Sequence, residues 1–314
     1  MSTPVSRRRL LLGLGAGIVT MSSSSILIRM AQAEGVPSLS IAAWRLVFAS
    51  LVLLPYAILR RREEMRSFTR KEWVLVASAG VFLGLHFATW IGSLGMTSVA
   101  SSVVLVSMGP VFVALGSWLL LRERLAVTAA AGIAVAAAGS AIIGWADLGR
   151  GHDRLVGDLL ALTGAVMVAG YLVIGRRVRA RRSLGVYIAL VYGAAMVTLL
   201  FIVLVAGKPM AGFSLPAYGW MLALALVPQL IGHSTLNWAL RHLSAAFVAA
   251  ATLAEPVASG ILAYLILGER ITPLILLGAA LILVGIYVAS RSEQAAAAPG
   301  AAVKDHGLQA RNGG

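Results

Sequence analysis

The sequence contains no cysteine and few charged residues, and each scarcity excludes a class of protein. Without cysteine, the 314-residue chain forms no disulfide, holds no thiolate metal site and has no cysteine nucleophile. Only 12% of its residues are charged, against roughly 25% in soluble domains, whereas 59% are hydrophobic. Acidic residues are the scarcer charged group, 12 against 26 lysines and arginines. The composition therefore indicates a membrane protein.

The net charge of +14 does not indicate nucleic-acid binding. The basic residues stand in short clusters between long apolar runs and form no continuous basic face. Such clusters are typical of the loops that anchor membrane helices on the cytoplasmic side. We therefore expect a lipid bilayer, and no nucleic acid, as a partner.

Ten apolar segments reach the ~20 residues that a helix needs to cross ~30 Å of hydrocarbon. Continuous apolar runs lack the alternation of a membrane barrel, and open sheets leave unpaired backbone groups in lipid. The sequence therefore predicts an all-α integral membrane protein. The ten predicted transmembrane helices are residues 10–32, 38–59, 73–94, 98–121, 126–146, 155–175, 184–206, 217–240, 244–267 and 272–290.

One stretch occurs twice, at residues 98–139 and 244–285, with a constant offset of 146. Such a repeat has to be explained before any single motif. Each copy predicts an apolar helix with a central proline, a charged corner, and a second apolar helix. The matching residues are Pro110 and Pro256, Glu123-Arg124 and Glu269-Arg270, Gly132 and Gly278, and Gly139 and Gly285.

Each copy belongs to a unit of five helices, an odd number, so the second unit enters the membrane from the opposite side. We predict two inverted five-helix repeats, residues 10–146 and 155–290, flanked by an N-terminal segment (1–9) and a disordered tail (291–314). Inverted repeats place a substrate site near the bilayer midplane, and rocking of one half exposes it to each side in turn. The topology favours a transporter.

Loop charges set the orientation. With the N-terminus in the cytoplasm, cytoplasmic segments hold 20 of the 26 basic residues and outer loops hold 4. We therefore predict a multi-pass inner (plasma) membrane protein with both termini cytoplasmic. The first segment also resembles a signal peptide, because Arg7, Arg8 and Arg9 precede it and Ala-Gln-Ala ends it. Cleavage would break the five-plus-five symmetry, so we expect this helix to be retained.

Two segments resemble the twin signatures of the EamA family of the drug/metabolite transporter superfamily. They are Pro110-Val111 followed by Leu-Leu-Arg-Glu-Arg-Leu at 120–125, and Glu255-Pro256-Val257 followed by Leu-Gly-Glu-Arg-Ile-Thr at 267–272. The resemblance covers about residues 10 to 290. It implies a ten-helix transporter, commonly an exporter, in a family whose substrates include amino acids and toxic cations. An aromatic amino-acid exporter is the member to test first.

We therefore expect a carrier of small organic metabolites or xenobiotics that works by alternating access. Two alternatives stay open, a flippase of lipid-linked substrates and a membrane-embedded enzyme. The chain has no H-E-x-x-H, G-x-S-x-G or P-loop motif, so we expect no catalytic residue, metal or cofactor. Partners are then a small-molecule substrate, the bilayer and, as an open question, protons. The oligomeric state stays open between monomer and homodimer.

Glu255 lies mid-span, where a carboxylate costs at least ~2.5 kcal/mol. It is a candidate proton carrier or partner for a substrate ammonium, and a structural hydrogen bond at Pro256 is an equal alternative. Pro110 and Pro256 remove a backbone donor, so we expect kinks that mark the cavity or a gate, with static packing as the alternative.

Polar residues on two other spans are candidates for the cavity. Gln229, His233 and Asn237 recur at i, i+4 and i+8, which places them on one helical face. Three polar groups facing lipid would be costly, so this face lines a cavity or bonds to a neighbouring helix. His86 and Trp90 form a similar pair, and the 146 offset sets His86 within one residue of His233.

The first two spans add Ser22, Ser25 and Trp44 as cavity-lining candidates. The serines can instead bond back to carbonyls one turn earlier. Arg45 lies ~10 Å below the outer end of its span, at 1.5 Å per residue. We expect a structural charge whose partner is a backbone carbonyl, Glu255 or a substrate carboxylate.

The charged corners lie at helix ends near opposite membrane surfaces. Glu123-Arg124 and Glu269-Arg270 are expected to cap helices and set the helical hairpin. A gating ion pair is the alternative, which requires burial because exposed pairs contribute under ~1 kcal/mol.

Overall fold

The structure is a computed structural model of the chain, and it describes residues 6–116, 126–147, 152–269 and 272–296. Every regular element in these ranges is helical. In lipid a helix satisfies its own backbone, which is why apolar runs take this form. The elements are α1 (Arg7–Ser22), α2 (Ser24–Ala33), α3 (Ser38–Arg60), α4 (Arg62–Arg66), α5 (Arg70–Leu94), α6 (Val99–Val106), α7 (Gly109–Gly116), α8 (Val127–Asp147), α9 (His152–Arg179), α10 (Leu184–Val205), α11 (Leu215–Leu224), the π-helix η2 (Ala225–His233), α12 (Ser234–Ala239), α13 (Ala245–Ala251), the 3-10 turn η3 (Thr252–Ala254), α14 (Glu255–Leu267) and α15 (Pro273–Ala296).

Seven helical stretches are long and apolar enough to cross a membrane. Shorter apolar helices cover residues 99–113, 127–139 and 276–285, within the predicted fourth, fifth and tenth spans. Each of the ten predicted segments therefore contains an apolar helix, and the number that cross the membrane stays a prediction. Helix α15 continues to Ala296, six residues into the segment predicted to be a disordered tail, and 297–314 lie outside the described residues.

The first predicted span is interrupted between α1 and α2 at Ser23. The hydroxyl of Ser22 donates to the carbonyl of Ile18 at 2.9 Å, and that of Ser23 donates to the carbonyl of Thr20 at 2.7 Å. Hydroxyls that bond back to the preceding turn bend helices. The serine run therefore explains a break that contains no proline.

Prolines lie at three further interruptions. Helix α6 ends at Val106, and α7 begins at Gly109, directly before Pro110. In the second copy η3 precedes α14, whose second residue is Pro256. The π-helix η2 contains Pro228. Because proline lacks an N–H, it opens the backbone hydrogen-bond ladder at each site. Two of the breaks occupy equivalent places in the two repeats.

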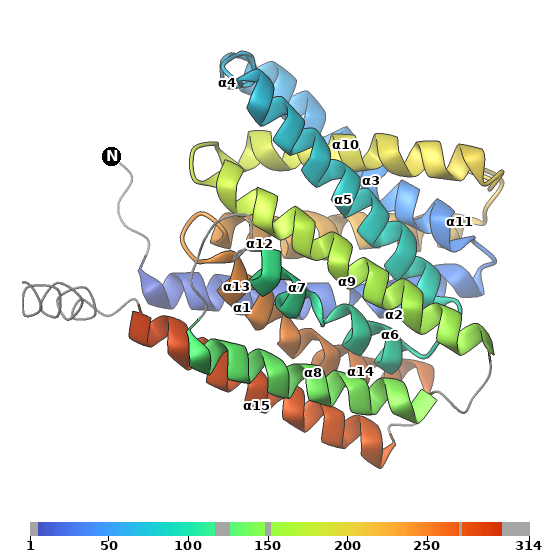
Figure 1. The fold of residues 1–314 in the computed structure, drawn as a ribbon. Helices are drawn as coiled ribbons and strands as arrows, with labels where there is room; N and C mark the ends of the chain where they lie inside the picture. Colours follow the sequence, from blue (N-terminus) through green and yellow to red (C-terminus); the bar gives the residue numbers. More distant parts are fainter. Residues whose placement is uncertain (1–5, 117–125, 148–151, 270–271, 297–314) are drawn as a thin grey trace, which may run out of the picture.

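Helices α8 and α15 pack side by side along one edge of the bundle (Figure 1). A Cβ atom added at Gly139 would lie 2.6 Å from the carbonyl oxygen of Gly278, and one added at Gly285 would lie 2.5 Å from that of Gly132. The offset of 146 relates each glycine to its counterpart, so the two contacts are equivalent. Backbones touch here because no side chain intervenes. The two repeats therefore meet here at equivalent positions.

One end of the bundle is closed by charged contacts between the repeats. Arg182 donates to the two carboxylate oxygens of Glu72 at 2.7 and 2.5 Å. Glu64 accepts the backbone N–H and the hydroxyl of Ser183 at 2.7 and 2.6 Å. The bond to Glu72 raises the pKa of the Arg182 guanidinium above its ordinary value. We call this the basic end, after the lysines and arginines of residues 60–71, 176–182 and 241.

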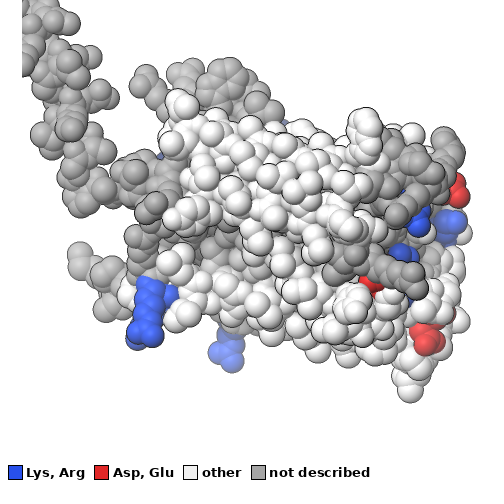
Figure 2. All heavy atoms as spheres, turned by 90° about the horizontal axis from the view of Figure 1, so that it is seen from below, with Lys and Arg blue, Asp and Glu red and all other residues white. Residues whose placement is uncertain are grey.

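The opposite end is held by contacts of the other loops. Ser40 donates to the carbonyl of Pro209 at 2.6 Å, and Ser214 donates to Glu34 at 2.6 Å. Between the two ends the surface is apolar. Figure 2 shows one face on which charged side chains gather toward the ends and uncharged residues cover the broad centre. A belt of this kind is what a bilayer requires.

Candidate functional site

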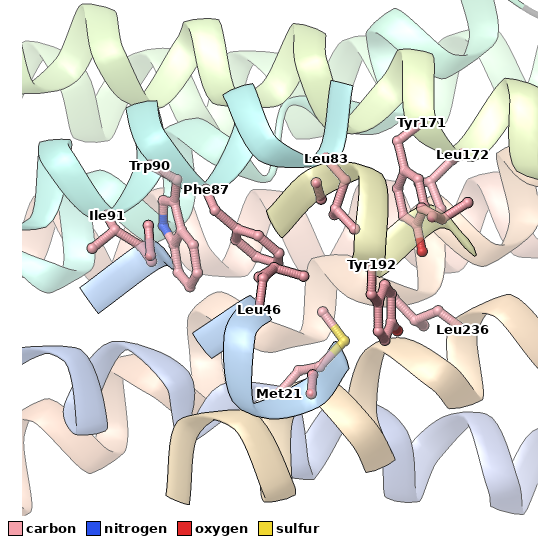
Figure 3. Close-up of a cluster of buried hydrophobic side chains, with 14 of the residues drawn as sticks. Met21, Leu46, Leu83, Phe87, Trp90, Ile91, Tyr171, Leu172, Tyr192 and Leu236 are labelled. Carbon is pink, nitrogen blue, oxygen red and sulfur yellow. The ribbon is translucent and has the colours of Figure 1, made fainter. Parts of the chain in front are cut away.

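A cavity of about 50 Å³ lies where the two repeats meet. The first repeat contributes α1, α5, α6 and α7 to its wall, and the second contributes α9, η2 and the helices from α12 to α14. Figure 3 shows Met21, Trp90, Tyr171 and Leu236 among the side chains of this region, each from a different helix. The site therefore belongs to neither repeat alone.

Two histidines line the cavity from equivalent helices of the two repeats. His86 on α5 bonds through Nδ1 to the carbonyl of Gly164 at 2.9 Å. Because a carbonyl only accepts, this nitrogen carries the proton. His86 also stacks on Trp90, with ring centroids 5.8 Å apart. His233 is 3% exposed and meets the edge of Phe87 at 5.2 Å. The structure thus brings together residues that the repeat offset relates.

Several polar atoms at the cavity have no partner among the described residues. Nε1 of Trp90 and Nδ1 of His233 are both buried and unbonded. A buried polar atom without a partner costs about 1–3 kcal/mol, so such atoms mark places that accept water or a ligand. The cavity wall therefore offers hydrogen-bonding capacity that the protein itself does not use.

Glu255 is the first residue of α14 and lines the cavity. The offset of 146 makes Gly109 its counterpart, and Gly109 lines the same cavity. The carboxylate is attracted to the guanidinium of Arg45. Pro110 also lines the cavity, whereas Pro256 is buried beside Glu255 and is not part of its wall. Among the described residues Glu255 is thus the one carboxylate that lines this space, and it belongs to the second repeat.

Arg45 is fully buried and does not line the cavity. Its Nε donates to the side-chain oxygen of Gln229 at 2.7 Å, and its Nη1 donates to the hydroxyl of Ser24 at 3.2 Å. The guanidinium lies 4.1 Å from the centroid of the Phe87 ring. Its Nη2 has no partner among the described residues. These partners are neutral, and the carboxylate of Glu255 also attracts the cation.

The three polar residues of the eighth predicted span make different contacts. Gln229 binds Arg45, His233 lines the cavity, and Asn237 donates to the hydroxyl of Tyr171 and to the carbonyl of His233. All three side chains are buried, and Gln229 and His233 belong to the π-helix η2. Pi-helical turns are frequent at functional sites.

Three other candidates lie away from the cavity. Ser22 bonds back to Ile18, the hydroxyl of Ser25 is buried without a partner among the described residues, and Nε1 of Trp44 donates to the carbonyl of Met210 at 2.9 Å. Trp44 also packs edge-on against Tyr218. These side chains support the walls and the outer loops and do not face the central space.

The charged corner of the second repeat contacts the first repeat. Glu269 accepts the backbone N–H of Val99, the first residue of α6, at 3.4 Å. It also lies 3.6 Å from Nη2 of Arg29, which donates to the carbonyl of Thr97. Both charged side chains are about a quarter to a third exposed, at 25% and 30%. Glu123, Arg124 and Arg270 lie outside the described residues.

Sequence reasoning missed Ser107 and Thr252 in the cavity wall. Each precedes its proline by three or four residues, at the break where the backbone turns. Polar residues just before Pro110 and Pro256 were the available signal. Among the described residues no group of three or more His, Asp or Glu could hold a metal ion.

Comparisons with known proteins agree with this architecture. The sequence model of the EamA-like transporter family matches residues 8–145 and again residues 155–291. A protein of Archaeoglobus fulgidus, named an uncharacterized transporter, is 25% identical over 273 residues, 87% of this chain and 93% of that protein. A protein of Streptantibioticus cattleyicolor, named a probable terminal-alkyne amino-acid exporter, is 29% identical over 194 residues, 60% of this chain and 63% of that protein. A crystal structure of a protein given no functional name shares the fold, with a TM-score of 0.71 at 21% identity over 93% of this chain and 100% of that one.

Proposed function

This chain belongs to the EamA-like transporter family of the drug/metabolite transporter superfamily, and we propose that it exports amino acids by alternating access. The family assigns transport rather than catalysis, and the name of the Streptantibioticus relative supports amino acids as the substrate class. One observation carries the proposal. The single cavity-lining carboxylate, Glu255, lies near one buried guanidinium, Arg45, at the junction of the two repeats.

These two charges suit the two ends of an amino acid. The ammonium group pairs with Glu255, and the carboxylate draws on the unbonded donors beside the cavity, Nη2 of Arg45 and Nε1 of Trp90. Charge-assisted hydrogen bonds of this kind are the strong ones. The stacked rings of His86 and Trp90 add an apolar wall for the side chain.

The central space is small in the described conformation. A space of about 50 Å³ holds a few water molecules, since one water needs about 10–15 Å³, and is too small for most amino acids. Helix α6 packs against α14 toward the end that holds Glu269, and α7 packs against α13 toward the basic end. In our proposal the substrate enters when one of these contacts separates and leaves when the other does.

The orientation follows from charge. We propose that the basic end faces the cytoplasm, because cytoplasmic loops of membrane proteins carry the excess of lysine and arginine. Both termini then lie in the cytoplasm of a cell whose inner membrane holds the protein. The sequence has no P-loop motif, so in our proposal export draws on an ion gradient, on the substrate gradient or on a partner subunit.

The test is uptake of labelled amino acids into proteoliposomes that contain the purified protein, with and without an imposed pH gradient. We expect saturable flux of tryptophan, phenylalanine or threonine, and a response to the gradient separates proton antiport from facilitated diffusion. Trp90→Phe removes one indole N–H at the cavity and is expected to raise KM. Trp44→Phe removes one indole N–H outside the cavity and is the matched control. Absence of flux from a folded, inserted protein contradicts the proposal.

A further inference from the structure

A second and larger hollow, of about 910 Å³, opens at the basic end. Its walls come from the start of α5, from the end of α9 and the segment that follows it, and from Arg241, which lies just after α12. The central cavity is lined by the middle of the same three helices, at His86, Tyr171 and Leu236. Along α9 the nearest lining residues of the two spaces, Leu172 and Arg176, are four positions apart, about 6 Å at 1.5 Å per residue. The hollow therefore continues the line of the cavity toward the basic end.

The hollow is strongly basic. Six cationic side chains line it against one carboxylate, that of Glu72, which Arg182 already binds. Four of the cations make no side-chain hydrogen bond or ion pair within the described ranges. These four are Lys71, Arg177, Arg181 and Arg241, and all are exposed. Their charges are therefore free to act on a solute.

A layer of polar contacts separates the hollow from the cavity. Arg176, which lines the hollow, donates to the carbonyl of Leu240 at 2.9 Å. Buried Arg179 donates to the carbonyl of Asn237 at 3.0 Å, and Asn237 donates to Tyr171, which lines the cavity. These contacts join α9 to α12 and lie between the two spaces in the described conformation.

We propose that this basic hollow is the mouth through which substrates reach the cavity, and that they carry a carboxylate and no net positive charge. The inference rests on the proposed transport function and narrows its substrate class. A concave surface of one sign raises the local concentration of solutes of the other sign by about tenfold or more. The local concentration of acidic amino acids therefore rises most, that of zwitterions rises little, and that of cations falls. Cationic xenobiotics, which belong to the family's range, are therefore poor substrates of this chain.

The first test uses membrane vesicles turned inside out, which present the cytoplasmic face to added substrate. Initial uptake rates are measured for labelled glutamate, threonine and lysine at low ionic strength and at 1 M salt, where the screening length falls to ~3 Å. The variant is Arg177→Gln with Arg181→Gln and Arg241→Gln. The matched control is Arg60→Gln with Arg62→Gln and Arg66→Gln, three exposed arginines at the same end but outside the hollow.

For glutamate we expect the hollow variant to raise KM about two- to tenfold at low salt, with kcat unchanged and no difference at 1 M salt. The control variant and threonine uptake change little, and lysine is carried poorly. An equal KM change in both variants, or lysine transported as well as glutamate, overturns the inference and leaves the proposed function standing. Absence of uptake for all three, together with absence of flux for the three amino acids tested in proteoliposomes, defeats the proposed function itself.

A second measurement does not depend on transport. The chain has no cysteine, so Ala180→Cys places one thiol in the wall of the hollow. Its rate of modification by an anionic and by a cationic methanethiosulfonate reagent reports the local potential. At low salt we expect the hollow to raise the modification rate of the anionic reagent about two- to tenfold relative to that of the cationic reagent. This difference should disappear in the variant that lacks Arg177, Arg181 and Arg241. Equal ratios in both backgrounds refute a hollow that attracts anions.

Discussion

Substituting Gly285 by alanine tests whether the reciprocal glycine contact holds the two repeats together. The added Cβ would lie 2.5 Å from the carbonyl oxygen of Gly132, and ordinary van der Waals contact begins at 3.4 Å. Helices α8 and α15 must therefore move apart by about 0.9 Å, because the opposing atom belongs to the backbone and cannot rotate away. Overpacking of this kind costs about 1–3 kcal/mol. Alanine returns at most ~1 kcal/mol of helix propensity. We expect a net loss of about 1–2 kcal/mol.

The assay is equilibrium unfolding in mixed detergent micelles, followed by loss of helical circular dichroism as the denaturing detergent increases. Gly260→Ala is the control, since no atom lies within 4 Å of a Cβ added on α14 at that position. We expect this control to leave the free energy of unfolding unchanged or raise it by up to about 1 kcal/mol, because it gains helix propensity without a clash.

The symmetric partner sharpens the test. Gly139→Ala should cost about as much as Gly285→Ala, because its Cβ would lie 2.6 Å from the carbonyl oxygen of Gly278. One separation of the helices relieves both clashes, so the double variant should cost less than the sum of the two single variants. A Gly285→Ala protein as stable as the Gly260→Ala control, or strictly additive effects, would refute the reasoning.

Three further predictions concern single residues. Glu255→Gln should raise the KM of transport, because a neutral amide attracts the substrate ammonium less than a carboxylate does, and should lose the pH dependence of transport in proteoliposomes; an unchanged pH profile removes Glu255 from any proton step. Arg45→Met should lower transport at least tenfold and the free energy of unfolding by about 1–3 kcal/mol, because the buried side-chain oxygen of Gln229 loses its donor; transport at the native rate would make the role purely structural. Gly268→Ala should lower the unfolding free energy by about 1 kcal/mol, because Gly268 ends α14 at φ = +67°; an unchanged melting temperature contradicts this.

The helical architecture was predictable because its signals are local. Apolar runs of membrane length and a constant offset of 146 need no knowledge of neighbours, and they yield the all-helical class and the twofold plan. The prolines at 110 and 256 are local signals as well, and both helices are interrupted beside them. The serine break in the first span and the π-helix at residues 225–233 were not predicted. Each depends on how side chains bond once the helix is packed.

The partners of the polar residues were less predictable because they are far apart in sequence. Arg45 bonds Gln229, which lies 184 residues further along the chain. The sequence showed that Arg45 was too deep to reach water, and it left the choice between carbonyl, Glu255 and substrate open. Trp44 was predicted to line the cavity because it is an aromatic residue within a span. Its indole N–H instead donates to the carbonyl of Met210, in a loop at the outer end. Only the packing of the two repeats decides these cases.

The repeat offset makes Gly109 the counterpart of Glu255, and this difference between the repeats bears on how such a protein arises from a duplicated gene. Two identical chains in opposite orientations would present two facing carboxylates or none, and two like charges in a space of about 50 Å³ would repel strongly. Once the copies are fused, each position mutates independently. The chain could therefore keep glycine at 109 and a single acid at 255 while its helix breaks and its glycine contact stayed twofold. Fusion thus allows the residues that line the cavity to change independently of the helices that form the two repeats.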